Sequence, residues 1–310
     1  MKQITFILHG KIKKRDKLIA SVKAVFTGPE TLNFVVTEHA DHSVELARNA
    51  AIWGATHIIC VGGDGSLNEV VNGVMLFKQN NVSLGEHDLP AIGVLPHGTG
   101  NDFARTMGVS FNIGLLKKWI DEDCFRRIDI GLTSFSDKSG KPATRYFINF
   151  TDVGIGGAIV LDLSTSSRAL GPFLTYQKAL LSAMLTYKNK PVKVSADTFN
   201  YERSIMSLVV ANGKYFGGGM GIAPDALPDD KLFSVVIIGA ISIPTYLKNL
   251  GSIRKSKKID HPELKYLSAS EILIESPEGP LPIDMDGEFI GFSPIRMKIV
   301  PGAINFIAPK

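Results

Sequence analysis

The chain is poor in cysteine. Cys60 and Cys124 are the two cysteines in 310 residues, and neither lies in a closely spaced Cys/His pair. The sequence therefore supports neither a disulfide framework nor a zinc site. Long apolar runs are lacking as well. The longest extends over residues 232–243, which is too short for a helix that spans a bilayer.

The first ten residues, MKQITFILHG, contain an apolar stretch that is too short for a signal peptide. This pattern is typical of a first buried strand. Because the sequence offers neither a targeting segment nor a membrane span, we expect a cytoplasmic protein.

Neither sign of charge dominates. Lysine and arginine number 34 and aspartate and glutamate 30, which gives a formal net charge of +4. So small an excess argues against dedicated nucleic-acid binding, and it fits an anionic ligand or an anionic membrane surface better. With 45% hydrophobic and 21% charged residues, the composition is that of a folded chain. The length allows two modest domains or one large one, and the oligomeric state stays open.

The pattern of predicted secondary structure changes near residue 126. Before it, short apolar strand patterns at 4–8, 32–37, 57–61 and 91–95 alternate with amphipathic helix patterns. This alternation predicts a parallel sheet covered on both faces. After it, many short strand patterns, among them one at 146–150, are separated by Gly, Pro, Asn and Asp, with helical insertions at 173–187 and 244–254. We therefore expect an α/β domain over residues 1–126 and a β-sandwich over 127–301.

The segment VGGDGSLNEVVNG, residues 61–73, has the features of a phosphate-binding turn. A buried strand ends in Gly62-Gly63-Asp64-Gly65, and a helix begins near Ser66. The glycines let the backbone approach a ligand, and a helix N-terminus offers N–H groups and partial positive charge. Taken alone, a tight turn with Asp64 as a helix cap explains the pattern equally well.

A second glycine-rich turn, PHGTGNDF at residues 96–103, follows another predicted strand and opens another helix. Carboxyl ends of neighbouring parallel strands meet at one edge of the sheet, where open α/β folds bind their ligands. The recurrence favours a nucleotide site over two unrelated turns.

Two groups of acidic residues lie in the second half of the chain. One surrounds Asp286-Gly287-Glu288, and phosphoryl transfer to an alcohol needs such a base together with cations. An exposed hairpin turn is the alternative. The other group surrounds Asp230, where a carboxylate and backbone carbonyls suit Mg²⁺, with a simple turn as the alternative.

The motifs GGDGSLNEVVNG, LPHGTGNDFAR, NGKYFGGGMGIAPDA and DMDGE, in this order, resemble those of the bacterial diacylglycerol kinase-like lipid kinases. The resemblance extends from about Ile4 to the C-terminus. GGDG alone is shared with NAD kinases and phosphofructokinases, whereas Asn68-Glu69, the second loop and the late DGE select lipid kinases. The resemblance implies an α/β ATP-binding domain, completed by residues 302–310, and a β-sandwich.

The resemblance also implies roles for particular residues. The positions that match the family's ATP-binding residues are His9, Gly10, Lys11, Thr37, Gly63, Asp64, Gly65, Ser66, Leu67, Asn68, Glu69 and Thr99. Two of these matches depart from the family pattern. His9-Gly10 stands where the family often has Asn-Pro or Asn-Gly, and Ser66 replaces a commoner threonine but keeps the hydroxyl.

For catalysis, the resemblance implies a proton acceptor at Glu288 or Asp286, with Asp64 as the other contender because sphingosine kinases use the loop aspartate. For Mg²⁺ it implies the carbonyls of Leu227 and Leu232 and the carboxylate of Asp230. Lys231 stands where the family usually has glycine, which places a cation beside the ion.

The leading hypothesis is an ATP-dependent kinase that phosphorylates a lipid hydroxyl, with diacylglycerol as the first acceptor to consider. An NAD kinase-like or other small-molecule kinase and a non-catalytic nucleotide-binding sensor are the alternatives. Four cations at residues 254–258 follow an apolar helix pattern. This cluster fits peripheral contact with the inner face of a membrane or, equally, a solvated loop.

Overall fold

The computed structural model describes residues 1–81, 89–165 and 172–309. Contacts within the chain define two compact units. Unit 1 comprises Met1–Ile128 and Gly302–Lys310, and unit 2 comprises Asp129–Pro301. The chain thus passes from one unit to the other twice.

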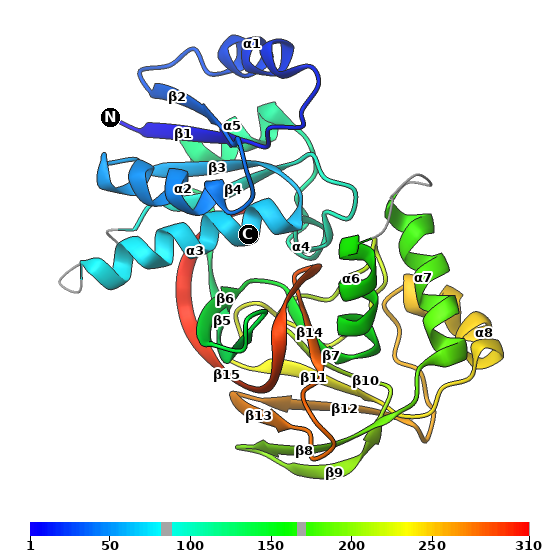
Figure 1. The fold of residues 1–310 in the computed structure, drawn as a ribbon. Helices are drawn as coiled ribbons and strands as arrows, with labels where there is room; N and C mark the ends of the chain where they lie inside the picture. The colour runs from blue at the N-terminus through cyan, green and yellow to red at the C-terminus, as the bar shows by residue number, and fades with distance from the viewer. Residues whose placement is uncertain (82–88, 166–171, 310) are drawn as a thin grey trace. The chain divides into compact units, whose positions relative to one another are not determined.

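Unit 1 is built on a parallel sheet in the order β2-β1-β3-β4 (Figure 1). Its strands are β1 (Gln3–Leu8), β2 (Thr31–Val36), β3 (His57–Gly62) and β4 (Ala91–Pro96). The end of β15 (Glu288–Ile307) adds a further parallel strand, with Phe306 opposite Ile92. All six residues of β3 are buried, because this strand is central and covered on both faces.

The helices that the described residues form beside this sheet are α1 (Arg15–Val25), α2 (His42–Ile52), α3 (Asp64–Asn80), α4 (Asp102–Thr106) and α5 (Ile113–Asp121). Val22 of α1 and Leu116 of α5 join the core on one face of the sheet. Helices α2 and α3 pack against each other on the opposite face (Figure 1). Their approach is close, since a Cβ added to Gly73 would lie 2.3 Å from the carbonyl oxygen of Val44.

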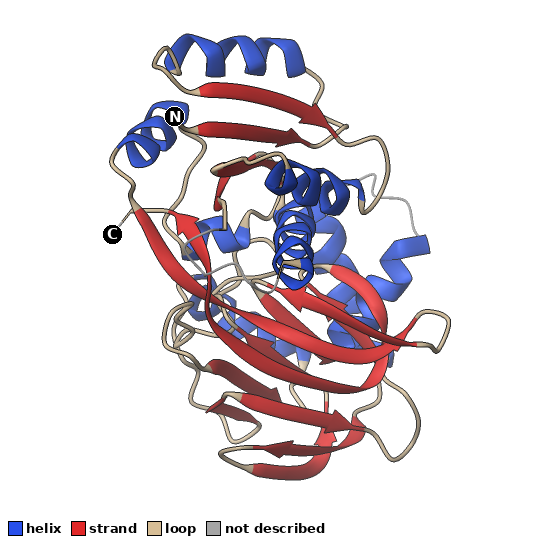
Figure 2. Ribbon diagram, turned by 90° about the vertical axis from the view of Figure 1, so that its left-hand side faces the viewer, coloured by secondary structure: helices blue, strands red, loops and turns tan. Residues whose placement is uncertain are grey.

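Unit 2 is a β-sandwich with a helical cover. Its elements are β5 (Phe125–Asp137), β6 (Pro142–Phe147), β7 (Phe150–Gly154), α6 (Ile155–Thr165), α7 (Pro172–Thr186), β8 (Lys190–Ala196), β9 (Asn200–Ile205), β10 (Ser207–Ala211), β11 (Phe233–Ile238), α8 (Ile243–Arg254), β12 (Leu264–Ala269), β13 (Glu271–Glu275), β14 (Pro282–Met285) and most of β15. One layer has the order β12-β11-β10-β7-β14-β15, and the other pairs β9, β8 and β13 with the same β15. Figure 2 shows β15 as the long strand that joins them.

Alternation along the strands places the core of unit 2. Val210 and Val235 point between the two layers, whereas their neighbours Val209 and Val236 point to the opposite face. Residues of α6, α7 and α8 pack over that opposite face. Strands β10 and β11 are therefore apolar on both sides, which is why they appear in the sequence as continuous hydrophobic runs.

The fold class predicted from the sequence, an α/β domain followed by a β-sandwich, is confirmed. Helix α6 was not predicted. The predicted strand 146–150 is divided, because β6 ends at Phe147 and β7 begins at Phe150. Within the described residues, no helix is both long and apolar enough to cross a membrane.

Candidate active site

The carboxyl edge of the unit 1 sheet brings together the loops that follow β1, β2, β3 and β4. His9-Gly10-Lys11 follows β1, Thr37 follows β2, the GGDG turn follows β3 and Thr99 lies in the loop after β4. Backbone N–H groups of the first loop donate hydrogen bonds to its neighbours. The N–H of Gly10 donates to Thr37 Oγ1 at 2.9 Å, and the N–H of His9 donates to the carbonyl of Val61 at 3.0 Å.

The two glycine-rich loops touch each other through their backbones. A Cβ built on Gly98 would lie 2.4 Å from the Cα of Gly63, which is far inside van der Waals contact. Only glycine at position 98 permits this approach without a shift of the backbone. The N–H of His97 also donates to the carbonyl of Gly62 at 2.8 Å. The second loop is therefore held directly against the first.

Asp64 fixes this arrangement with its carboxylate. Oδ2 accepts a hydrogen bond from the N–H of Asp102, and Oδ1 accepts one from the N–H of Phe103, both at 3.0 Å. The side chain thus satisfies the first N–H groups of α4. Helix α3 begins at Asp64 itself, and its N-cap residue Gly63 supplies no side-chain hydrogen bond. The first turn of this 17-residue helix keeps N–H groups that can face a phosphate.

Three of the predicted ATP-binding residues point their side chains into the fold. Leu67 and Asn68 are each 1% exposed. Glu69 accepts hydrogen bonds from the N–H groups of Asp41 and Ser43, both at 3.2 Å, and so holds the start of α2. These three side chains therefore support the fold of the first glycine-rich loop and its helix and do not point into solvent at the edge of the sheet.

Two hydroxyl-bearing residues of the same prediction remain accessible. Thr99 is exposed and Ser66 is half-buried. Both glycine-rich loops thus present an accessible hydroxyl.

Asp286 of the DGE motif is buried in unit 2. Its carboxylate accepts hydrogen bonds from the N–H groups of Ile148 (3.0 Å), Asn149 (3.1 Å) and Phe150 (2.8 Å). These bonds replace strand pairing at the junction of β6 and β7, which is the physical reason that the predicted strand 146–150 is divided. The backbone donors occupy this carboxylate, so it is poorly placed to take a proton from a substrate.

Glu288 has a different environment. Its side chain is 42% exposed, and Oε2 accepts a hydrogen bond from Arg145 Nη2 at 3.1 Å. Among the three predicted proton acceptors, Glu288 has no backbone amide on its carboxylate in the described structure. It is the acid of the DGE motif that solvent or a substrate can reach.

The predicted Mg²⁺ residues lie in the loop between β10 and β11. Asp230 Oδ1 accepts a hydrogen bond from the N–H of Leu232 at 3.0 Å, and Asp129 Oδ2 accepts one from the N–H of Lys231 at 2.6 Å. Burial raises the pKa of Asp230, and the neighbouring charges of Asp129 and Asp229 add to this effect. Hard oxygen donors with mutual repulsion fit a magnesium ion.

Lys231 adopts a left-handed conformation, with φ of 66°. This conformation explains why glycine is the usual residue at this position in the family that the sequence resembles. The described residues include no group of three or more His, Cys, Asp or Glu that could hold a metal. An ion here would therefore depend on backbone carbonyls.

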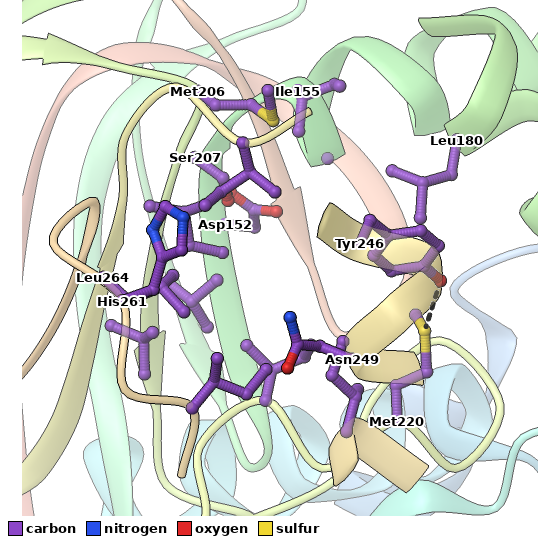
Figure 3. Close-up of a pocket in the computed structure, with 18 of the residues that line it drawn as sticks. Asp152, Ile155, Leu180, Met206, Ser207, Met220, Tyr246, Asn249, His261 and Leu264 are labelled. Carbon is purple, nitrogen blue, oxygen red and sulfur yellow. Dashed lines mark hydrogen bonds between the residues drawn. The ribbon is translucent and has the colours of Figure 1, made fainter. Parts of the chain in front are cut away.

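Unit 2 also contains a deep apolar cavity between its strands and helices (Figure 3). Val209, Val236 and Ile238 form its floor, Leu180 and Met184 of α7 line one side, and Tyr246 of α8 contributes another. The volume of the cavity is about 120 Å³, and the cavity opens to solvent. Hydrocarbon surface of this kind favours an apolar ligand.

One acid lines this cavity. Asp152 of β7 is 4% exposed and accepts a hydrogen bond from Ser207 Oγ at 2.6 Å. Burial raises the pKa of Asp152 to about 7, and the Ser207 hydroxyl opposes that rise. Asp152 also lies opposite Asp284 of β14. Burial and the charge of Asp152 raise the pKa of Asp284 well above the ordinary value.

Asp152 was not among the site residues predicted from the sequence. Its one available signal was an acid inside an otherwise apolar strand, FTDVG. Such an acid is uncommon in a buried strand and marks a possible site.

Models of two protein families match the chain. Residues 3–133 match the diacylglycerol kinase catalytic domain, and residues 153–308 match the YegS C-terminal NAD kinase beta sandwich-like domain. The chain is 27% identical over 310 residues to a Yersinia enterocolitica protein named "Probable lipid kinase YegS-like", covering 100% of this chain and 98% of that one. It is 28% identical over 295 residues to a Staphylococcus carnosus protein named "Diacylglycerol kinase", covering 93% and 88%.

Solved structures show the same fold. A crystal structure of a diacylglycerol kinase from Bacillus anthracis str. Sterne superposes with a TM-score of 0.75 at 23% identity, covering 99% of this chain and 97% of that one. The two domain models occur in the same order as the two units, and the second model alone spans half of the chain. The chain therefore belongs to the YegS and diacylglycerol kinase-like family of lipid kinases.

Proposed function

We propose that the protein transfers the γ-phosphate of ATP to the hydroxyl of a lipid, with diacylglycerol or a related lipid alcohol as acceptor. The observation that carries this proposal is the apolar cavity of unit 2, in a chain that belongs to a lipid kinase family. NAD and sugar phosphates are polar throughout and have no hydrocarbon to place against Val209, Val236 and Leu180. A lipid alcohol has a hydrocarbon chain that can pack there.

In this proposal the nucleotide phosphates bind at the carboxyl edge of the unit 1 sheet. The first-turn N–H groups of α3 and the hydroxyls of Ser66 and Thr99 are suited to hold them. Gly63 and Gly98 let the backbone come close to the phosphates. Asp64, which closes the two loops on each other, acts as a positioning residue.

Glu288 is our candidate for the group that takes the proton from the lipid hydroxyl. Its carboxylate is accessible, whereas backbone N–H groups occupy those of Asp64 and Asp286. Arg145 orients it through the 3.1 Å contact. A positioned general base contributes roughly 10²–10⁴-fold to a reaction rate.

Mg²⁺ is the cation we propose for the loop between β10 and β11. Asp230 would hold it by its carboxylate, and Leu227 and Leu232 would hold it by their carbonyls. The ion would offset the repulsion between Asp230 and Asp129. Lys231 reduces the negative charge of this loop, so we expect weaker binding than with glycine at that position.

A lipid acceptor has to be reached from the surface of a bilayer. Lys255, Lys257 and Lys258 are exposed after α8, and Lys257 also lines the cavity. Each basic residue near an anionic surface contributes about 1 kcal/mol to attraction. We propose peripheral contact with the cytoplasmic face of the membrane through this segment.

The test uses purified protein, Mg²⁺ and ATP labelled at the γ-phosphate. Diacylglycerol and other lipid alcohols, NAD and sugar phosphates are offered separately as acceptors. We expect label in a lipid product. Label in NAD alone, in a sugar phosphate alone or in no product would overturn the proposed function.

A further inference from the structure

Two buried acids lie opposite each other where β7 pairs with β14. Asp152 is the register partner of Asp284, and the two residues are 4% and 2% exposed. Directly opposite residues of an antiparallel pair place their Cβ atoms about 4.5–5.5 Å apart on the same face of the sheet. Each carboxyl group therefore lies within reach of the other's charge.

The structure gives this pair few hydrogen-bond donors. Asp152 Oδ1 accepts a hydrogen bond from the Ser207 hydroxyl at 2.6 Å (Figure 3). Asp284 Oδ1 accepts one from the N–H of Gly287 at 2.9 Å. By contrast, the nearby carboxylate of Asp286 accepts three backbone N–H groups. Two carboxylates that are so deeply buried and so poorly solvated cannot both be charged at neutral pH.

Acidic neighbours add to the cost of charging the pair. Burial raises the pKa of Asp284 well above its ordinary value, and the charges of Asp152, Asp286 and Glu288 raise it further. Burial also raises the pKa of Asp152, to about 7. Because the two groups interact, their protons belong to the pair rather than to either residue. At least one proton therefore stays on the pair at neutral pH.

Other titratable groups approach the pair from the helical side of the sheet. Tyr187 follows α7 directly and interacts with the charge of Asp152. Lys257 and His261 line the same cavity as Asp152. Among the described residues, however, no basic side chain lowers the pKa of either carboxyl of the pair. A retained proton is thus what removes the second negative charge.

Asp284 also holds the turn that carries Glu288. Met285 and Glu288 face each other across a two-residue turn, in which Asp286 and Gly287 have φ of 49° and 87°. Positive φ at both positions is typical of the type I′ turn of a hairpin. The hydrogen bond from Gly287 to Asp284 ties this turn to β14. The position of the Glu288 carboxylate therefore depends on Asp284.

We propose that Asp152 and Asp284 share a retained proton, and that this proton keeps Glu288 in position through the turn at Gly287. Loss of the last proton to solvent hydroxide leaves two negative charges on directly opposite residues. Their repulsion separates β7 from β14 at this point and moves the turn. Asp152 and Asp284 are thus positioning residues that make turnover sensitive to alkaline pH. The role of Glu288 as the base rests on the proposed function, whereas the shared proton does not.

The first experiment detects the proton without ATP or lipid. The C=O stretching band in the infrared spectrum of the full chain distinguishes a protonated carboxyl from a carboxylate, and it is followed from pH 6 to pH 10. We expect the wild type to keep a protonated-carboxyl band at pH 8. Asp284→Asn should lose the band near pH 7, where the remaining Asp152 titrates. Asp152→Asn should lose it about one pH unit or more below the wild type, because the charge opposite Asp284 is gone.

The matched control is Thr151→Val. Thr151 adjoins Asp152 on β7 and lies opposite Met285 of β14. Its side chain points to the other face of the same strand pair, since successive side chains of a strand alternate. Valine keeps the shape of threonine and changes no carboxyl, so the band should titrate as in the wild type.

The second experiment measures kcat and KM for phosphate transfer to a lipid alcohol from pH 7 to pH 10. In the wild type, kcat should fall by about tenfold for each pH unit beyond the loss of the last proton, with an unchanged KM for ATP. This alkaline fall should be absent from Asp152→Asn and from Asp284→Asn, because neither variant can place two charges on the pair. Thr151→Val should follow the wild-type profile.

Asp284→Leu tests the link to the turn. Leucine has a similar volume but offers no acceptor to the N–H of Gly287, so we expect kcat to fall by roughly 10²-fold at every pH, as for a displaced catalytic group. Asparagine at the same position should restore most of this loss at pH 7, because its amide oxygen can accept that N–H group. Thermal melts establish that each variant is folded.

A wild-type chain without the protonated-carboxyl band at pH 8 would overturn the inference, and so would a band that titrates identically in both asparagine variants. Equal alkaline falls of kcat in the wild type and these variants, or full turnover in Asp284→Leu, would overturn it as well. Lipid phosphorylation by a chain that lacks the band removes this inference alone. The expected band without phosphate transfer to any lipid removes the proposed function, and with it the role of Glu288, but leaves the shared proton in place.

Discussion

The carboxylate of Asp64 lies 3.0 Å from the backbone nitrogen of Phe103, 39 residues further along the chain. Together with the bond from the N–H of Asp102, this contact closes the two glycine-rich loops on each other. The aspartate of the GGDG motif therefore holds the loops in place, and it affects a ligand through the position of these loops.

Asp64→Asn should lower both stability and ATP affinity. Asparagine offers one acceptor oxygen, so one N–H group of α4 loses its partner, which costs about 1–2 kcal/mol. We expect a lower melting temperature and a raised KM for ATP. A fall in kcat by orders of magnitude with unchanged melting temperature and KM would instead assign Asp64 to proton transfer.

Gly98→Ala tests the contact between the loops. The added Cβ would lie 2.4 Å from Gly63 Cα, so the loops must separate. We expect ATP affinity to fall by roughly tenfold or more, with about 1–3 kcal/mol lost from the free energy of unfolding. Gly114→Ala in α5 is the control, because its Cβ meets Asn112 Oδ1 at an ordinary 3.4 Å. Equal ATP affinity in both variants would contradict the role of Gly98.

Glu288→Gln should lower kcat by about 10²–10⁴-fold, since a general base is lost, with a small change in melting temperature. The side chain is 42% exposed, so the fold depends little on it. Glu271→Gln is the matched control, because Glu271 is 39% exposed and forms a surface ion pair with Arg296 at 2.7 Å. Full turnover in the Glu288 variant would remove this residue from the base role.

Asp152 should make stability depend on pH. Its pKa in the folded protein is about 7, against an ordinary value of 3.8. The folded state therefore holds the proton more tightly, and the stability linked to Asp152 is full below about pH 4 and lost as the pH rises through about 7. Asp284 and Tyr187 face the same carboxyl.

Chemical denaturation from pH 4 to pH 8 checks this. Relative to the wild type, Asp152→Asn should gain roughly 3–4 kcal/mol over that range, because the amide has no charge to desolvate. Thr151→Val should follow the wild-type pH profile. A constant difference between Asp152→Asn and wild type at all pH values would refute the assigned titration.

Mg²⁺ should raise the melting temperature of the protein in the absence of ATP. An ion at one hundred times its Kd adds about 2.7 kcal/mol to the stability of the state that binds it. Asp230→Asn should abolish this rise and Asp229→Asn should retain it. Lys231→Gly should increase it, since glycine adopts φ of 66° without strain and removes a cation. An equal rise in Asp230→Asn would place the ion elsewhere.

Much of the architecture could be predicted from periodicity. Strands β3 and β4 and the helices that follow them each have a regular spacing of apolar residues over a few positions. This local spacing determines whether the segment forms a strand or a helix. Helix α6 escaped prediction because Gly156 and Gly157 follow its first residue, Ile155, and glycine disfavours helices locally. Tertiary packing requires them there, since a Cβ on Gly157 would lie 2.0 Å from the carbonyl oxygen of Pro282.

The position of the loops could be predicted, but the direction of their acids could not. Asp64, Glu69 and Asp286 bind backbone N–H groups that are 38, 28 and 136 residues away. Such partners depend on the completed fold, and nothing in a short motif identifies them. Asp152 was missed for a related reason, because an isolated acid in an apolar strand acquires meaning only once the cavity around it is known.

The three hydrogen bonds that Asp286 accepts divide the DGE motif into two halves under different selection. Loss of this aspartate would disrupt the junction between β6 and β7 whether or not the protein turns over a substrate. Loss of Glu288 would leave that junction intact. A homologue that lost catalytic activity would therefore retain Asp286, whereas Glu288 would be free to change. Glu288 is thus the better marker of catalytic activity.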